Sequence, residues 1–386
     1  MAEITCPTVF IVKRVLFFIE SLSGGGAEKV LVTYLQYLDK QKYEITLLTL
    51  VDTGVYKDYI DSFQLHYSSI IHPSRNKIIT LKNTIKYNLV YHYLPTWLVS
   101  RLVIPRGYDL YVAFTEGFAT KLIASVPGKK MAWVHIDLKS FPWTQEKRIF
   151  RNLQEEKRVY TKYNRVVCVS ESVERGMMDL YDLSNTMTLS NPIDSEKIQS
   201  LSYADCDIHF NASSFNIIAI GRLTRQKGYD ILIPLIGRLR KEKIDVNLFI
   251  MGEGEQRDSL ERIILDENLS DSVHLLGYYK NPYPFFSQMD LLICSSRAEG
   301  YSLVIAEALV LGIPVVSMNC AGPRELLDNG SFGCLCDTYE ELAVALFRVV
   351  TDKRYYQFLK LQAINRRPFF DIRKSVSRLE MLFDIL

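Results

Sequence analysis

The apolar and polar positions in the first half of the chain alternate in the manner of an open α/β sheet. A short apolar run at Arg14–Ile19 is typical of a buried parallel strand, and a glycine-containing loop follows it. Helical spacing predicts a helix over Ala27–Leu38, and a second strand is expected at Tyr43–Val51. This order is a βαβ unit. Further strands are predicted at Leu110–Phe114, Lys130–His135 and Arg165–Ser170.

The second half repeats this logic, so the 386 residues are expected to form two α/β domains. Strands are predicted at Phe215–Ile220, Val246–Met251, Val273–Leu276, Leu291–Cys294 and Pro314–Met318. Helices are predicted at Asp230–Glu242, Gln256–Glu267, Pro284–Gln288, Ser302–Leu311 and Tyr339–Ala363. The polar segment between residues 191–194 and Phe215 is predicted to be a linker.

Charge is unevenly spread, although the net charge is only +2. Residues 1–190 hold 24 Lys and Arg against 18 Asp and Glu, and residues 191–386 hold 22 against 26. A stretch without acidic residues, 75–106, interleaves basic residues with aromatic and aliphatic ones. It is either a surface for anionic lipid or a phosphorylated acceptor, or a helix that packs its apolar face in the core. The nearly neutral chain does not favour a nucleic-acid partner.

The chain is expected to be cytosolic. No stretch offers the roughly 18 apolar residues of a membrane-spanning helix. The apolar run Thr8–Val12 is short and has no basic run before it, which does not fit a secretory signal. The seven scattered cysteines are predicted to be reduced and mostly buried. Cys334 and Cys336 lack the second pair that a zinc site needs.

The loop Gly24-Gly25-Gly26 lies between a predicted strand and a predicted helix. Ligands of doubly wound sheets bind beyond the carboxyl ends of the strands, and a helix N-terminus favours an anion. A diphosphate could therefore approach the backbone N–H groups here. The loop matches neither the dinucleotide-binding Gly-x-Gly-x-x-Gly motif nor a Walker loop, which argues against a simple dehydrogenase or ATPase.

Two segments of the second half carry charged residues toward the same predicted cleft. Arg222 and Lys227 follow its first strand, where a guanidinium and an ammonium suit a diphosphate leaving group; alternatively they are solvated loop cations. Glu299 ends a later loop and Glu307 lies two turns into the following helix, so that they could grip hydroxyls of a sugar and a ribose. Glu307 could instead be a buried structural carboxylate.

Taken together, several ordered pieces of the chain resemble family 4 of the retaining glycosyltransferases, of the type that builds bacterial surface polysaccharides. The pieces are Gly24–Lys29, Asn191–Asp194, Gly221–Gly228, Gly252–Gly254, Glu299–Glu307, Gly312–Val316 and Gly322–Glu325. The resemblance implies the GT-B fold, in which two Rossmann-like domains face each other across a cleft. It implies an acceptor-binding domain over 1–190, a nucleotide-sugar-binding domain over 191–368, and a tail helix over 369–386 that crosses back.

The resemblance also implies roles for single residues. Arg222 and Lys227 would bind the donor diphosphate, Glu307 the ribose, and Glu299 the transferred sugar. Gly25 and Gly26 would face the diphosphate from the opposite domain. N–H groups of Gly300, Tyr301, Ser302 and Leu303 would bind phosphate at a helix N-terminus. His135 matches a histidine near the reacting sugar, although a lone histidine is more often structural.

The implied reaction is transfer of a hexose or N-acetylhexosamine from a nucleotide diphosphate sugar, more often UDP than GDP, with retention and without a metal ion. Asp205-Cys206-Asp207 mimics the metal-binding Asp-x-Asp of another glycosyltransferase class, but it lies in the predicted linker. The expected acceptor is a lipid-linked saccharide at the inner face of the cytoplasmic membrane, contacted through residues 75–106. Alternatives are a soluble acceptor, a sugar-nucleotide epimerase and a non-catalytic partner subunit.

Overall fold

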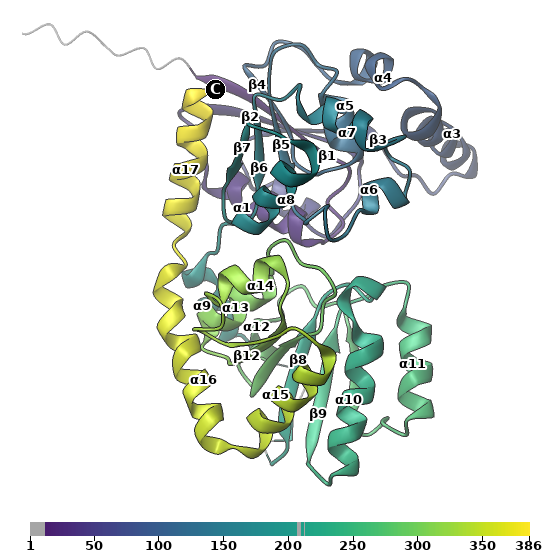
Figure 1. The fold of residues 1–386 in the computed structure, drawn as a ribbon. Helices are drawn as coiled ribbons and strands as arrows, with labels where there is room; N and C mark the ends of the chain where they lie inside the picture. Colours follow the sequence, from purple (N-terminus) through teal and green to yellow (C-terminus); the bar gives the residue numbers. More distant parts are fainter. Residues whose placement is uncertain (1–11, 207–209, 212) are drawn as a thin grey trace, which may run out of the picture.

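The computed structural model describes residues 12–206, 210–211 and 213–386, and Figure 1 shows two α/β units, one above the other. The first unit holds a parallel sheet in the order β3-β2-β1-β4-β5-β6-β7. Its strands are β1 (Lys13–Ile19), β2 (Tyr43–Val51), β3 (His66–Ile71), β4 (Leu110–Ala113), β5 (Lys129–Val134), β6 (Arg165–Cys168) and β7 (Thr186–Thr188).

The second unit holds a parallel sheet in the order β10-β9-β8-β11-β12-β13. Its strands are β8 (Phe215–Ile220), β9 (Val246–Met251), β10 (Val273–Gly277), β11 (Leu291–Cys294), β12 (Val315–Met318) and β13 (Cys334–Cys336). The predicted α/β class and GT-B-type architecture are confirmed. In each sheet the strand order reverses beside the first strand, and ligands of such folds bind at the carboxyl ends of the strands at that point.

Helices cover the faces of both sheets. Those of the first unit are α1 (Gly26–Tyr37), α2 (Lys57–Ile60), α3 (Lys77–Asn88), η1 (Leu89–Tyr93), α4 (Thr96–Val103), α5 (Phe118–Ile123), α6 (Trp143–Glu146), α7 (Leu153–Tyr160) and α8 (Glu171–Tyr181). Those that follow are α9 (Ser195–Ser202), η2 (Arg225–Lys227), α10 (Tyr229–Lys241), α11 (Arg257–Asp266), α12 (Tyr283–Phe286), α13 (Leu303–Leu311), α14 (Ala321–Leu326), α15 (Tyr339–Thr351), α16 (Lys353–Arg366), η3 (Arg367–Phe369) and α17 (Ile372–Ile385).

Two predictions about the second half were wrong in detail. The helix predicted over Tyr339–Ala363 is two helices, because Asp352 ends α15 in an extended conformation and its carboxylate accepts hydrogen bonds from the first backbone N–H groups of α16. The predicted linker contains α9, whose Ile198 packs in the core of the second unit. Of the Asp205–Asp207 motif, Asp207 lies outside the described residues.

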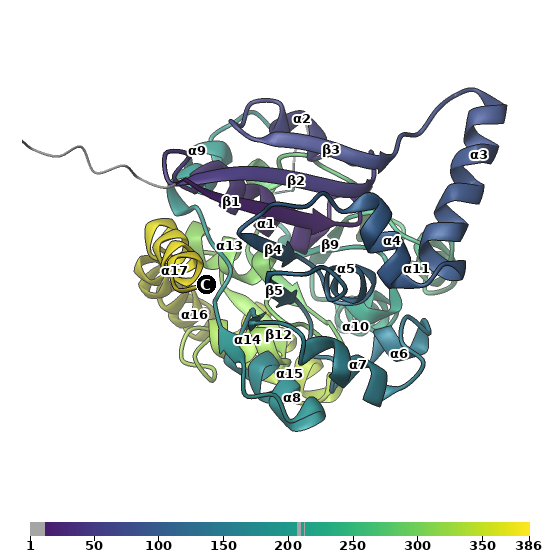
Figure 2. The ribbon, with the colours of Figure 1, turned by 90° about the horizontal axis from the view of Figure 1, so that it is seen from above.

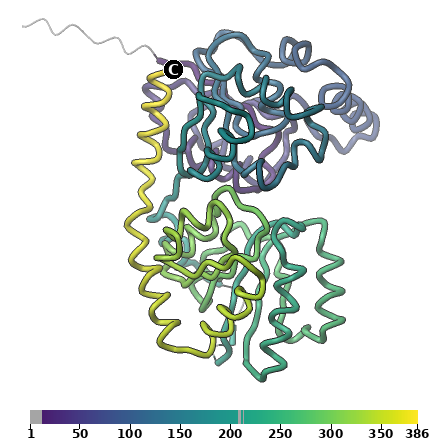
Figure 3. Tube along the Cα trace, in the orientation of Figure 1, coloured from purple at the N-terminus to yellow at the C-terminus, as the bar shows by residue number. Residues whose placement is uncertain are grey.

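The last helix returns to the first unit. Val376, Leu379, Leu382 and Phe383 of α17 are buried in the same apolar core as β1 and β2. Figure 3 shows α17 beside the first unit and α16, which precedes it, beside the second, both toward the yellow end of the colours. The tail therefore ties the end of the chain to the start of the first sheet.

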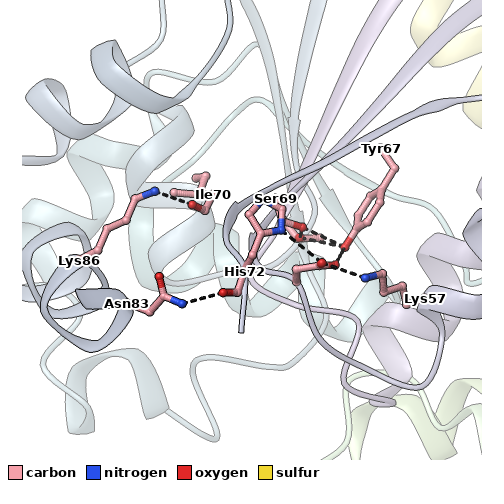
Figure 4. A network of polar contacts seen from close by, with 9 residues as sticks. Lys57, Tyr67, Ser69, Ile70, His72, Asn83 and Lys86 are labelled. Atoms are coloured by element: carbon pink, nitrogen blue, oxygen red, sulfur yellow. Dashed lines mark hydrogen bonds and ion pairs between the residues drawn. The ribbon is translucent and has the colours of Figure 1, made fainter. Parts of the chain in front are cut away.

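Helix α3 stands away from the body of the first unit, as Figure 2 shows, and none of its residues is buried. Polar contacts tie it to the end of β3: Lys86 Nζ donates to the Ile70 carbonyl at 2.6 Å, and Asn83 Nδ2 donates to the His72 carbonyl at 2.6 Å (Figure 4). The sequence left two alternatives for residues 75–106, a surface for a ligand or a helix packed in the core. Packing in the core was wrong for α3, because its apolar face points to solvent. Helix α4 does bury Val99.

Of the six described cysteines, Cys168 and Cys336 are buried and the other four are partly buried; Cys6 lies outside the described residues. The prediction that most thiols are buried was therefore wrong, because the four others lie at strand ends or in loops. Among the described residues, no helix is long and apolar enough to cross a bilayer.

Candidate active site

The N-termini of two helices from different units meet in the cleft. Helix α1 begins after the N-cap Gly25, and α13 begins after the N-cap Ser302. A Cβ built on Gly26 would lie 3.6 Å from Leu303 Cδ1, which places the two first turns in contact. Backbone N–H groups in the first turn of a helix have no partner within the helix and favour an anion. The predicted glycines Gly25 and Gly26 are thus beside the predicted loop 300–303.

Gly300 explains why the units can approach this closely. A Cβ on Gly300 would lie 2.2 Å from the carbonyl oxygen of His135 and 2.8 Å from the Ile136 Cα, far inside contact distance. The backbone of the second unit therefore passes directly against the loop after β5. Only glycine allows this approach, and Tyr301 then packs on the cores of both units.

Lys227 and Glu299 form an ion pair on the second unit's side of the cleft. Lys227 Nζ lies 2.5 Å from Glu299 Oε1, and the Ser296 hydroxyl donates to the same oxygen at 2.7 Å. Burial opposes the charge of Lys227, but Glu299 outweighs it and raises the pKa of the ammonium. Arg222, in the preceding loop, is exposed and close enough to act electrostatically on Lys227. The cations predicted to bind a diphosphate are thus neighbours.

Glu307 is paired with a lysine that the sequence interpretation did not include in the site. Lys29 Nζ of α1 lies 2.5 Å from Glu307 Oε1 and 2.9 Å from the Tyr283 hydroxyl. The Glu307 side chain is only 5% exposed. Burial opposes the charge of Lys29, but Glu307 raises the pKa of its ammonium well above the ordinary value. The pair joins the two units across the cleft.

His135 directly follows β5 and lies at the cleft, as predicted from its position after the strand. Its Nε2 donates to the Phe114 carbonyl at 2.8 Å, which fixes the proton on Nε2 because a carbonyl only accepts. Burial lowers the pKa of His135 to about 4, so the ring is neutral near pH 7. Nδ1 then carries the lone pair, and His135 can accept a hydrogen bond there. Glu116, also absent from the predicted site, accepts from the His135 backbone N–H at 2.9 Å.

Glu28 holds the N-terminus of α1. Its carboxylate reaches back to the backbone N–H of the N-cap Gly25, as in a capping box. Burial raises the pKa of Glu28, and the positive charge of Arg222 acts on it across the cleft in the opposite direction. The two units thus present to each other cations and helix N-termini, which favour an anion.

Two family models match consecutive parts of the chain. The model described as Glycosyltransferase Family 4 matches residues 24–197, and the model described as Glycosyl transferases group 1 matches residues 207–366. Among curated relatives, a Campylobacter jejuni protein is 28% identical over 363 residues, which are 92% of this chain and 94% of that one. It is named N-acetylgalactosamine-N,N'-diacetylbacillosaminyl-diphospho-undecaprenol 4-alpha-N-acetylgalactosaminyltransferase. The Rhizobium meliloti lipopolysaccharide core biosynthesis glycosyltransferase LpsE is 28% identical over 48% of this chain and 54% of its own.

Solved structures share the fold. The Anabaena protein HepE in complex with UDP and glucose superposes with a TM-score of 0.73 at 20% identity, covering 96% of this chain and 99% of that one. TarM of Staphylococcus aureus, in a complex that contains UDP, gives a TM-score of 0.71 at 14% identity, covering 96% of this chain and 100% of its own. From these matches and the cleft described above, the chain belongs to the family 4, group 1 glycosyltransferases and is an enzyme of that kind.

Proposed function

We propose that this enzyme transfers a hexose or N-acetylhexosamine from a UDP-sugar, with retention and without a metal ion, to a lipid-linked saccharide at the inner face of the cytoplasmic membrane. The product would belong to a cell-surface polysaccharide. The observation that carries the proposal is the meeting of the α1 and α13 N-termini beside Lys227, with Arg222 exposed in the preceding loop.

The donor diphosphate would lie between the two helix ends. The N–H groups of Gly26 and Leu303 and the cations Arg222 and Lys227 would share its negative charge. As the sugar–oxygen bond breaks, charge grows on the leaving phosphate, and cations already in position lower the barrier most effectively. In this proposal the two side chains carry the role that a metal ion has in other glycosyltransferases. The HepE and TarM structures contain UDP, which supports UDP as the nucleotide.

The carboxylates would hold hydroxyl groups. Glu307 would bind the ribose, with Lys29 as its neighbour, and Glu299 would bind the transferred sugar while paired with Lys227. Neutral His135 would accept a hydrogen bond from a sugar hydroxyl at Nδ1. Because Lys227 already neutralises Glu299, we propose front-face attack, in which the leaving phosphate helps remove the acceptor proton. Curated relatives named as alpha-transferases support retention.

The acceptor side is supported by the surface of α3. Ile78, Leu81 and Ile85 share one helix face and are 67%, 62% and 52% exposed. Lys77, Lys82 and Lys86 lie on the same helix, which has no acidic residue. An exposed apolar face with lysines on the same helix suits the interface of an anionic membrane. The Campylobacter relative, named for an undecaprenol-linked acceptor, supports a lipid-linked saccharide.

The donor assignment is tested by incubation with UDP- and GDP-sugars, in EDTA or with Mg²⁺, and a polyprenyl-diphosphate-linked disaccharide. We expect nucleotide release coupled to product formation with UDP-sugars, unchanged in EDTA. Transfer that strictly requires a divalent metal would contradict the proposed chemistry. Release of a free epimerised sugar without acceptor would instead support an epimerase.

Membrane contact is tested by co-sedimentation with vesicles of phosphatidylglycerol and phosphatidylcholine. The triple variant Ile78→Ser, Leu81→Ser, Ile85→Ser should bind at least about tenfold more weakly, since each change removes buried apolar surface. The matched control is Val344→Ser with Phe347→Ser, two exposed apolar residues of α15. Equal binding by the triple variant and the wild type would remove α3 from the membrane contact and favour a soluble acceptor.

A further inference from the structure

Three adjacent parallel strands deliver polar groups to one point of the first sheet. Glu20 directly follows β1, Glu116 is the third residue after β4, and His135 directly follows β5. Strands β1 and β4 pair in register, as do β4 and β5. The three residues therefore emerge side by side at the carboxyl edge that faces the cleft.

The two carboxyl groups are satisfied to different degrees. Glu116 is 8% exposed, and its oxygens accept from the His135 backbone N–H at 2.9 Å and from Trp143 Nε1 at 3.3 Å. Glu20 Oε1 is buried and has no hydrogen-bond partner within the described residues. A buried carboxyl oxygen without a donor is costly, and at the edge of a binding cleft a ligand can supply the missing hydrogen bond.

Another buried acid of the first unit shows what a purely structural arrangement looks like. Glu156 is fully buried, and its two oxygens accept from the Thr144 hydroxyl at 2.9 Å and from Gln145 Nε2 at 2.5 Å. The protein thus satisfies both oxygens of a buried acid where only stability is involved. Glu20 departs from this pattern at the edge of the cleft.

The surroundings of Glu20 connect the cleft with α3. Glu28 of α1 and Glu116 act on it electrostatically, and Glu20 in turn acts on Tyr87 and Tyr91. The Tyr91 ring stacks on Phe118 of α5 with centroids 4.3 Å apart, and on Tyr87 of α3 at 5.2 Å. Aromatic faces therefore lead from the exposed helix to the carboxyl pair. An acceptor held at the membrane by its lipid would reach the cleft along this side.

We propose that the Glu20 carboxylate, held beside Glu116, binds a hydroxyl group of the acceptor saccharide and positions it for attack on the donor sugar. This inference rests on the proposed function, because it takes a saccharide as the acceptor. A hydroxyl that donates to Glu20 Oε1 would supply the missing hydrogen bond. Glu116 would fix the loop of His135 and so keep the acceptor and the transferred sugar in register.

The charge state of Glu20 gives the test a second readout. Burial, followed by repulsion from Glu116 and then Glu28, raises its pKa to about 7, and Tyr87 and Tyr91 are the titratable groups that face it from α3 and η1. A carboxylate accepts a hydrogen bond more strongly than a protonated carboxyl group. Acceptor use should therefore rise as the pH increases through about 7.

The experiment compares wild type with Glu20→Gln, using a UDP-sugar that supports transfer and a polyprenyl-diphosphate-linked disaccharide. We expect kcat/KM for the acceptor to fall about 10- to 100-fold, as for loss of a hydrogen bond to a charged group. UDP affinity and slow donor hydrolysis without acceptor should stay within about twofold, an allowance for context dependence. The rise of kcat/KM with pH should disappear. Glu156→Gln, at a buried carboxyl group whose two oxygens both have donors, should leave acceptor kinetics unchanged.

Wild-type acceptor kinetics and pH profile in Glu20→Gln would overturn the inference and leave Glu20 structural. A parallel loss of UDP affinity would also overturn it, since the residue would then act through the donor site or the fold. Should Glu20→Gln not fold, Glu20→Asp keeps the charge but withdraws the carboxylate, and it should raise the acceptor KM selectively. A wild-type enzyme that hydrolyses UDP-sugar but transfers to no saccharide would refute the proposed function itself, and this inference with it.

Discussion

The ion pair between Lys29 and Glu307 joins the two units, and Lys29→Met is the most informative change to it. Methionine is an unbranched side chain only one atom shorter, but it removes the charge and the hydrogen bond to Tyr283. Glu307 would then remain buried without its cation, next to a tyrosine hydroxyl only. Burial of an unpaired charge is strongly unfavourable, so the variant should lose stability.

The magnitude follows from the burial of the two side chains. Removal of one partner from a fully buried pair costs about 3–5 kcal/mol. The Lys29 side chain is 33% exposed and that of Glu307 5%, so that solvent screens part of the interaction. We therefore expect a loss of about 2–3 kcal/mol for Lys29→Met, with Lys29→Met/Glu307→Gln at least about 1 kcal/mol more stable than the single variant.

The assay is denaturant unfolding of the four proteins of a double-mutant cycle. They are the wild type, Lys29→Met, Glu307→Gln and the double variant. The matched control is Lys280→Met, which also removes a lysine paired across the units, with Asp58 at 3.8 Å. These side chains are 58% and 80% exposed, so the control should cost less than about 1 kcal/mol. Equal losses for Lys29→Met and Lys280→Met, or a cycle with no coupling, would show that the pair of Lys29 and Glu307 does not stabilise the contact between the units.

Three further predictions concern the cleft. Gly300→Ala should lower kcat at least about tenfold, because its Cβ would collide with the His135 carbonyl and hold the units apart; normal turnover would contradict the close approach. His135, whose pKa falls to about 4 in the folded protein, takes up a proton more readily when unfolded; its contribution to stability should therefore fall by up to about 3 kcal/mol between pH 6.5 and 4. Calorimetry of wild type against His135→Gln measures this, and a difference independent of pH would oppose it. Arg222→Ala and Lys227→Ala should each lower kcat about 100-fold, as expected for groups that stabilise developing charge. The melting temperature should change little for the exposed Arg222, but it should fall for Lys227→Ala, which leaves Glu299 buried without its cation; wild-type turnover would remove the residue from the site.

The elements that position the site could be predicted because their patterns are strong. β1 contains a continuous apolar run. The glycines Gly25 and Gly26 clearly mark where the loop ends and α1 begins. Strands β3, β7 and β13 were not predicted. β7 and β13 have three residues each, and β3 carries polar and partly buried residues, so these edge strands show neither a long apolar run nor regular alternation.

Contacts between the units could not be predicted from periodicity. Lys29 and Glu307 are 278 positions apart, and only the packing of α1 against α13 brings them together. The same is true of Gly300 and the His135 carbonyl. The break between α15 and α16 at Asp352, by contrast, could have been predicted from the sequence, because aspartate is a favoured N-cap residue. The structure was needed to choose between the two alternatives for residues 75–106, because an amphipathic pattern does not tell which surface its apolar face contacts.

The anomeric configuration of the product decides whether this enzyme transfers a sugar from a nucleotide diphosphate donor with retention. The enzyme would be incubated in EDTA with a UDP-sugar and a polyprenyl-diphosphate-linked disaccharide, and the anomeric configuration of the purified product determined by proton NMR. We expect a product with the α configuration of the donor, formed together with UDP. A β-linked product, or none while UDP-sugar is consumed by another route, would contradict this expectation.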